Sequence, residues 1–372
     1  MFLIERLLGV MTYSALLLFV CNGIAISKPS SMKKWLVFYV VALSVMAFFY
    51  QPHQGADLVR LLGFMHSWAS MTPSALLEYC SHSNVPVYIA YFWLVGQAGV
   101  DGLLPCITCF IYYSLIFSGF WVFFIKYEIA PKEAAWGIAF FMSFGVFLEM
   151  ISGIRSSLAI AAVFWCCVRE IVIGKNPIAH TPLYLAASLT HPLGLFLTLL
   201  RFVVLVAQKT DRPHTRYAYF AISLIGIGVV FYLGPEYLNA MIDKGVNYST
   251  EAHYYSIWET VIHIVLIVVS LSLIVKLEKD LPEYKNDKVI KNLLIMQCVL
   301  MAIVFAGFFL DYAIYHRMST YLGMYSAMVL PLVMMREGAM SRYAKLVKTA
   351  VVVMLLLSCT RGNLSNYKFF VM

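Results

Sequence analysis

Long apolar runs recur along the whole chain, and they constrain its fold more than any other feature. A helix needs about 20 consecutive apolar residues to cross the hydrocarbon core of a bilayer. Residues 257–275 form one of about a dozen runs of this kind. Because this run lacks the alternation of apolar and polar residues that barrel strands show, it predicts a membrane helix. We therefore predict an all-α polytopic membrane protein with about 11–13 transmembrane helices.

Composition supports this class, because 62% of the residues are hydrophobic and only 12% are charged. Soluble proteins carry about a quarter charged residues. No soluble domain or internal repeat is evident, so we predict a single membrane domain over residues 1–372. The first run follows Glu5 and Arg6 instead of a basic leader segment, and we interpret it as a retained helix. The predicted spans are 7–26, 35–50, 85–100, 103–125, 134–150, 154–173, 182–207, 217–233, 257–275, 293–310, 318–335 and 343–357.

Lysine and arginine positions predict the orientation of the chain. A net charge of +8 would suggest a nucleic-acid partner in a soluble protein, but here the distribution of charge matters more, and we expect no such partner. Basic clusters lie at Lys28–Lys34, 201–216, 276–291 and 336–348, and the positive-inside rule places them in the cytoplasm. The connections 51–83, 236–256 and 311–317 contain few basic residues and are predicted to face outward.

If every predicted span crossed the membrane, the basic residues near 126–132 and 169–175 would lie on the outer side. That location conflicts with the positive-inside rule. Two segments resolve this conflict. Residues 85–100 are too short and polar to be a secure span. Residues 178–207 are interrupted by Thr190, His191 and Pro192, and a proline removes a helix hydrogen bond. We therefore predict a re-entrant hairpin there, which would place Arg155, His191, Arg317 and the loop with Asp57 on the outward side.

Arg155 stands in the motif "GIRSSLAIAA", directly before a run of small and apolar residues. Its guanidinium stays charged, and a charge in the middle of a bilayer is costly, so it must be paired or lie at the membrane edge. Ser152 and Gly153 indicate a helix start, where exposed N–H groups would add to the positive charge. This arrangement predicts an anion site. A pair with Glu149, or a loop position without function, is the alternative.

His191 and the cysteines are the next candidates for chemistry. A neutral histidine in an apolar segment can act as a base, an acid or a hydrogen-bond donor, although one satisfied by a backbone carbonyl would look the same. The eight cysteines include the pair Cys106 and Cys109, which lies in an apolar run without a second ligand pair. We interpret both as small apolar residues and expect no metal site.

The stretch 311–332 combines charged side chains with four tyrosines. Tyr321 and Tyr325 are one helical turn apart, and aromatic rings on one face suit the apolar faces of sugars, although interfacial tyrosines are often only anchors. In the first outward loop, Asp57 and Arg60 have the spacing of a surface ion pair, which would contribute little. The candidate substrate-binding residues are Arg60, Asp311, Tyr312, His316, Tyr321 and Tyr325.

Taken together, the loop with Asp57, "GIRSSLAIA", "LAASLTHPLGLFL" and "YHRMSTYLGMYSAMVLPL" resemble the EpsG group of bacterial polysaccharide polymerases, which are related to Wzy-type O-antigen polymerases. The resemblance implies a GT-C-like glycosyltransferase in the bacterial inner membrane. Such an enzyme joins oligosaccharide repeat units carried on undecaprenyl diphosphate at the outer face, without a metal or other cofactor. A regulator of chain length and membrane lipid are the other partners it implies.

That reaction requires fixed cations beside the leaving diphosphate, and Arg155 and Arg317 are the predicted candidates. His191 is predicted to position or deprotonate the acceptor hydroxyl, with Asp57 or Asp311 as the reserve. The loop 236–256 contains several tyrosines and is predicted to bind the growing glycan. Two alternatives remain open at this stage: a transporter or flippase for the same lipid-linked oligosaccharide, and an enzyme like an O-antigen ligase or a membrane acyltransferase.

Overall fold

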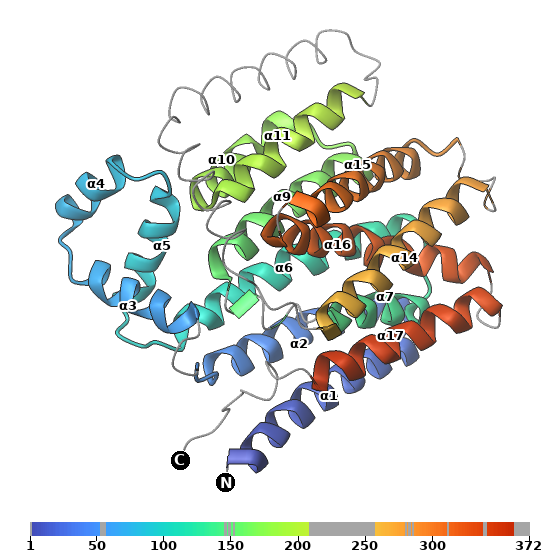
Figure 1. Ribbon diagram of the computed structural model, residues 1–372, viewed down its shortest axis with the longest axis horizontal. Helices are drawn as coiled ribbons and strands as arrows, with labels where there is room; N and C mark the ends of the chain where they lie inside the picture. Colours follow the sequence, from blue (N-terminus) through green and yellow to red (C-terminus); the bar gives the residue numbers. More distant parts are fainter. Residues whose placement is uncertain are drawn as a thin grey trace.

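The apolar runs form helices in the computed structural model of the chain (Figure 1). No β-strand occurs in the part of the chain that the structure describes, so the all-α prediction is confirmed. Predicted features at 217–233, 236–256 and Asp311 lie outside that part. The structure describes residues 2–52, 57–144, 147, 150–151, 153–207, 257–279, 281, 284, 286–310, 312–337 and 341–360.

Seven of the described helices are long and apolar enough to cross a membrane: α1, α2, α6, α9, α14, α15 and α16. The chain is therefore a multi-pass membrane protein. The bounds of the helices are α1 (Phe2–Ile26), α2 (Pro29–Phe48), α3 (Asp57–Ala69), α4 (Pro73–Ser81), α5 (Pro86–Gly96), α6 (Leu103–Lys126), α7 (Pro131–Ser143), α9 (Ile154–Ile173), the 3-10 turn η1 (Pro177–His180), α10 (Thr181–Thr190), α11 (Pro192–Ala207), α14 (Ile257–Lys279), α15 (Lys288–Leu310), α16 (Tyr312–Glu337) and α17 (Arg342–Thr360).

Two predicted spans, 85–100 and 134–150, correspond to helices that are too short to cross. Helix α5 has 11 residues and α7 has 13. At 1.5 Å per residue these helices are roughly 16–20 Å long, whereas the hydrocarbon core is about 30 Å thick. These two of the dozen predicted spans are thus shorter than a full crossing. In the predicted outward loop 51–83, the structure instead has two helices, α3 and α4.

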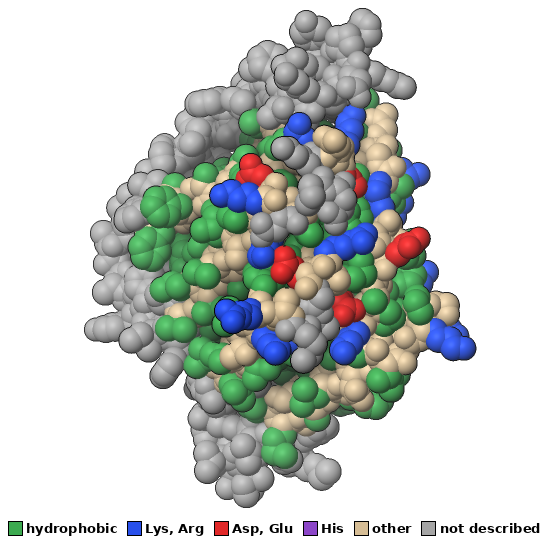
Figure 2. All heavy atoms as spheres, turned by 90° about the vertical axis from the view of Figure 1, so that its right-hand side faces the viewer, with side chains coloured by type: hydrophobic (Ala, Val, Ile, Leu, Met, Phe, Trp, Pro, Cys, Tyr) green, Lys and Arg blue, Asp and Glu red, His purple; other side chains and the backbone are tan. Residues whose placement is uncertain are grey.

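One end of the bundle collects the basic residues. Lys126 Nζ donates a hydrogen bond to the carbonyl of Val172 at 2.9 Å, which joins the C-terminal ends of α6 and α9. Lys276 Nζ lies 3.0 Å from Glu337 Oε1, which joins the ends of α14 and α16. Lys and Arg side chains gather on the face toward which these helix ends point (Figure 2). We call this face the basic end, and the positive-inside rule assigns it to the cytoplasm.

The segment 178–207 folds as a helical hairpin. Its break is His191, whose backbone is extended with φ −158° and ψ 143°. The rings of Tyr184 in α10 and Phe202 in α11 lie 5.7 Å apart between centroids, so the two helices run back along each other. The tip approaches α9 closely, because a Cβ on Gly194 would lie 3.0 Å from that of Ala159 and would overlap the carbonyl of Ala187. The predicted helical hairpin is therefore present, and its re-entrant course in the membrane stays a prediction.

Candidate functional site

Arg155 lies in the first turn of α9, at the end of this helix opposite to the basic end. Helix α9 begins at Ile154, as the sequence predicted, and the side chain of Arg155 is partly buried. Its Cζ lies 4.8 Å from the ring centroid of Tyr88 in α5. Arg155 forms no salt bridge with any residue that the structure describes, while Glu149 lies outside the described residues. A guanidinium above an aromatic ring at a helix N-terminus favours an anion as its ligand.

Tyr88 adds a hydroxyl to this cation. The residue is only 3% exposed, and its Oη has no hydrogen-bond partner among the described residues. Burial raises the pKa of Tyr88 to about 12, while the guanidinium groups of Arg155 and Arg60 act in the opposite direction. The phenol is therefore protonated at neutral pH and can donate to an oxyanion. No local sequence pattern marks Tyr88, and we did not predict a role for it.

Asp57 and Arg60 form the surface ion pair that their spacing predicted. Arg60 Nη2 lies 3.0 Å from Asp57 Oδ1, and the two side chains are about 60% exposed. Both residues lie in the first turn of α3, beside α5 (Figure 1). An exposed pair of this kind contributes about 1 kcal/mol at most. A reserve catalytic role for Asp57 stays a prediction.

His191 links α10 to α11 through its side chain. Its Nδ1 accepts the backbone N–H of Leu193 at 3.1 Å and thereby caps the first turn of α11. Since a neutral imidazole carries its proton on only one nitrogen, this bond places the proton on Nε2. His191 can then donate a hydrogen bond from Nε2. The geometry thus favours a donor over the general base that we predicted.

The hairpin brings His191 to the same end of α9 as Arg155. Gly194, near the tip, lies against Ala159, which is one helical turn from Arg155. The open end of the hairpin lies at the other end of α9, beside Glu170. Arg155 and His191 therefore lie at the same end of α9, and their outward orientation stays a prediction.

The C-terminal candidates divide into two groups along α16. His316 and Arg317 lie in its first turns, partly buried, and the ring of His316 is 4.9 Å from that of His263. Glu337 at the far end of α16 belongs to the basic end, so Arg317 lies in the half of the helix opposite to the basic end. Asp311 and the side chain of Tyr312 lie outside the described residues.

Tyr321 and Tyr325 differ from the sugar platform that we predicted. Both are at most 1% exposed, and their hydroxyls lie 3.1 Å apart. Tyr321 also donates to Cys167 Sγ, and the ring of Phe164 packs 5.1 Å from that of Tyr325. Because both rings are covered by α9, neither offers a face to a sugar in this structure. The helical spacing correctly predicted that the two tyrosines share one face of α16. It did not predict that this face is buried.

A buried polar cluster at the base of the hairpin was not predicted. Glu170 of α9 accepts hydrogen bonds from Arg201 Nε at 2.9 Å and from Tyr184 Oη at 2.8 Å, and it lies 3.1 Å from His180 Nδ1. The side chains of Arg201 and Glu170 are 2% and 1% exposed. We predicted Arg201 to belong to a cytoplasmic basic cluster, and the structure shows it buried inside α11, within the predicted span 182–207, where it neutralises Glu170. The cluster fixes both arms of the hairpin to α9.

Comparison with known proteins gives one match. The sequence matches the EpsG family over residues 66–370, a range that contains Arg155, His191 and Arg317 but begins after Asp57 and Arg60. No curated protein and no solved structure matches the chain. The GT-C-like architecture therefore stays a prediction.

Proposed function

The chain belongs to the EpsG family of Wzy-type polymerase-like membrane proteins, and from this premise we propose that it polymerises lipid-linked oligosaccharide repeat units into a surface polysaccharide. The proposed donor is a repeat unit on undecaprenyl diphosphate, at the outer face of the bacterial inner membrane. The proposed transfer proceeds without a metal. A membrane regulator of chain length is a proposed partner.

The observation that carries this proposal is the cation at Arg155. Transfer of a sugar from a lipid diphosphate breaks a glycosyl–phosphate bond, and negative charge develops on the departing oxygen. Among the residues that the structure describes, Arg155 forms no salt bridge, and the phenol of Tyr88 beside it has no hydrogen-bond partner. Fixed donors of this kind stabilise a developing oxyanion because they need no reorganisation during the reaction. Arg317 lies in the outward half of α16 and is proposed as a second cation for the same diphosphate.

The acceptor side of the reaction is assigned to the tip of the hairpin. With its proton on Nε2, His191 donates a hydrogen bond to an oxygen of the acceptor sugar or of the diphosphate and so holds the two reactants together. The hydrogen bonds of Glu170 to both arms of the hairpin fix the position of this tip along α9. Asp57 is retained as the reserve base.

Glycan length in cells tests this proposal directly. Cells that lack the protein should replace a ladder of polysaccharide lengths with a single repeat unit, and the wild-type gene should restore the ladder. Loss of the single capped unit as well would identify a flippase or a ligase, because those steps precede or follow polymerisation. An unchanged ladder would reject all three functions.

Two substitutions of His191 separate its structural role from its proposed catalytic one. Asparagine is a strong N-cap residue, so His191→Asn should keep the cap of α11 but remove the Nε2 donor. We expect His191→Asn to lower polymerisation by about 100-fold, the lower end of the range for one positioned proton donor, without a change in thermal stability. His191→Ala should lose about 1 kcal/mol of capping energy in addition. A normal ladder in the Asn variant would show that His191 is only a cap.

A further inference from the structure

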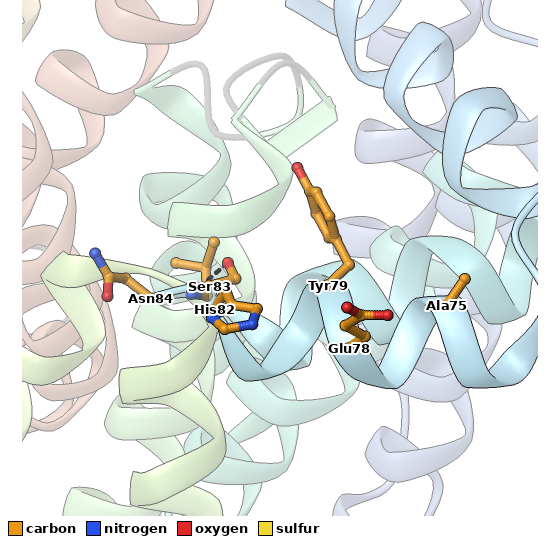
Figure 3. Close-up of a pocket in the computed structure, with 7 residues that line it drawn as sticks. Ala75, Glu78, Tyr79, His82, Ser83 and Asn84 are labelled. Atoms are coloured by element: carbon orange, nitrogen blue, oxygen red, sulfur yellow. Dashed lines mark hydrogen bonds between the residues drawn. The ribbon is translucent and has the colours of Figure 1, made fainter.

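A pocket of about 610 Å³ lies between the end of α4 and the start of α5 (Figure 3). This volume falls within the range of about 300–1,000 Å³ that is typical of small-molecule sites. No residue of the pocket belongs to the candidates derived from the sequence. Its lining residues are Ala75, Glu78, Tyr79, His82, Ser83, Asn84 and Val85.

The lining has the chemistry that a sugar requires. Glu78 supplies carboxylate acceptors, and Asn84 supplies both a donor and an acceptor, so both residues have groups that can bind hydroxyls. His82 adds a third polar group. The ring of Tyr79 is 47% exposed and stands up from α4 beside the pocket, as Figure 3 shows, so it offers an apolar face. An aromatic face combined with several hydrogen-bonding groups matches a saccharide better than a purely apolar or purely anionic ligand.

The frame of the pocket is held in place by local hydrogen bonds. Thr72 caps the start of α4 by accepting the N–H of Ala75 at 3.4 Å. In the connection to α5, Ser83 Oγ accepts the N–H of Val85 at 3.2 Å. Helix α5 then begins with Pro86, whose fixed φ suits a first helical position. Because the binding groups lie on these fixed elements, little conformational freedom has to be lost when a ligand binds.

One aromatic cluster connects the pocket with Arg155. Trp68 of α3 lies 6.3 Å from the ring of Tyr79 and 5.3 Å from the ring of Tyr88, measured between centroids. Tyr88 in turn lies under the guanidinium of Arg155 at 4.8 Å. The pocket and the cation are thus separated by two intervening aromatic side chains. A ligand with a sugar at one end and a phosphate at the other would match this order.

We propose that the α4–α5 pocket is a saccharide subsite, which binds a sugar of the lipid-linked oligosaccharide whose diphosphate lies at Arg155. This assignment rests on the proposed function for the identity of the ligand. Tyr79 forms the platform, and Glu78, His82 and Asn84 bind hydroxyl groups. The subsite deepens the proposed function because it fixes the direction in which the oligosaccharide leaves the diphosphate.

Photo-cross-linking in cells tests the subsite. A benzophenone-bearing phenylalanine analogue is placed at position 79 of the full chain, and the purified protein is stained for carbohydrate after irradiation. The matched control carries the analogue at position 110. Phe110 is 49% exposed and lies in α6, a helix that contributes no residue to the pocket. We expect a carbohydrate-positive adduct at position 79 and only background staining at position 110. Equal staining at both positions would overturn the subsite.

Substitutions in the pocket separate the subsite from the proposed function. Tyr79→Ala should lower polymerisation about tenfold, as for loss of one anchoring aromatic group, whereas Tyr79→Phe should keep the platform and most of the activity. Equal amounts of both variants in the membrane serve as the folding control. If deletion of the protein abolishes the ladder while Tyr79→Ala leaves it normal, the subsite is wrong and the function stands. If deletion leaves the ladder intact, the proposed function fails.

Discussion

Arg155→Lys is expected to abolish most polymer formation although it conserves the charge. A guanidinium presents a planar fork that can bind two phosphate oxygens at once, whereas an ammonium group is a point charge. A lysine would also lose the stacking of Arg155 on the ring of Tyr88, which holds the cation in place at 4.8 Å. We expect polymerisation to fall by about 100-fold or more, as for removal of one fixed donor to a developing oxyanion. The measurement is the length ladder together with the rate of polymer formation in isolated membranes.

Substitutions of Tyr88 provide the matched controls for Arg155. Tyr88→Leu removes the ring beneath the guanidinium and should reproduce part of the loss of polymerisation. Tyr88→Phe keeps the ring and removes only the hydroxyl, so it measures the contribution of the hydroxyl alone. Arg342→Lys is a second control, because Arg342 is exposed at the start of α17, which follows the end of α16 at the basic end. It should retain activity close to wild type. A normal ladder in Arg155→Lys would leave Arg155 as a residue that only marks the start of α9.

Helix positions could be predicted from the sequence where apolar runs are long. The predicted span 154–173 coincides with α9, because the apolar run ends at Gly174, which takes the left-handed conformation with φ 73°. The hairpin was also predictable, since Pro192 cannot continue the helix that precedes it. Helices α3 and α4 could not be found in this way. They are short and exposed on one face, so their apolar residues do not form a continuous run.

The site was predicted only in part, because the contacts that define it are remote in sequence. Arg155 stood out through its own motif, but Tyr88 lies 67 positions earlier in a short apolar segment that shows no polar signal. Arg201 was grouped with the basic residues that follow it. Its burial depends on Glu170, which is 31 residues away and belongs to another helix. Local patterns identify charges that lie in unusual places, but they do not identify their partners.

Breaking the buried pair between Glu170 and Arg201 is expected to lower the free energy of unfolding much more than breaking the exposed pair between Asp57 and Arg60. Both side chains are at most 2% exposed, so Glu170→Gln would leave the guanidinium of Arg201 buried without its counter-charge. Removal of one partner from a buried ion pair costs about 3–5 kcal/mol. We expect the midpoint of thermal unfolding in detergent to fall by roughly 6 °C or more. The exposed pair supplies the control, since Asp57→Asn should shift this midpoint by only a degree or two.

Thiol labelling during heating measures this effect at the site itself. Cys167 is fully buried, and its Sγ lies 3.7 Å from the hydroxyl of Tyr184, which also bonds to Glu170. Opening of the cluster should therefore expose Cys167 at a lower temperature in Glu170→Gln than in the wild type. The double variant Glu170→Leu with Arg201→Met should recover much of the loss, because no unpaired charge remains in it. If Glu170→Gln were as stable as the wild type, the cluster would not fix the hairpin. If the cluster does fix it, Glu170→Gln should also lower polymerisation, because the hairpin carries His191 to the same end of α9 as Arg155.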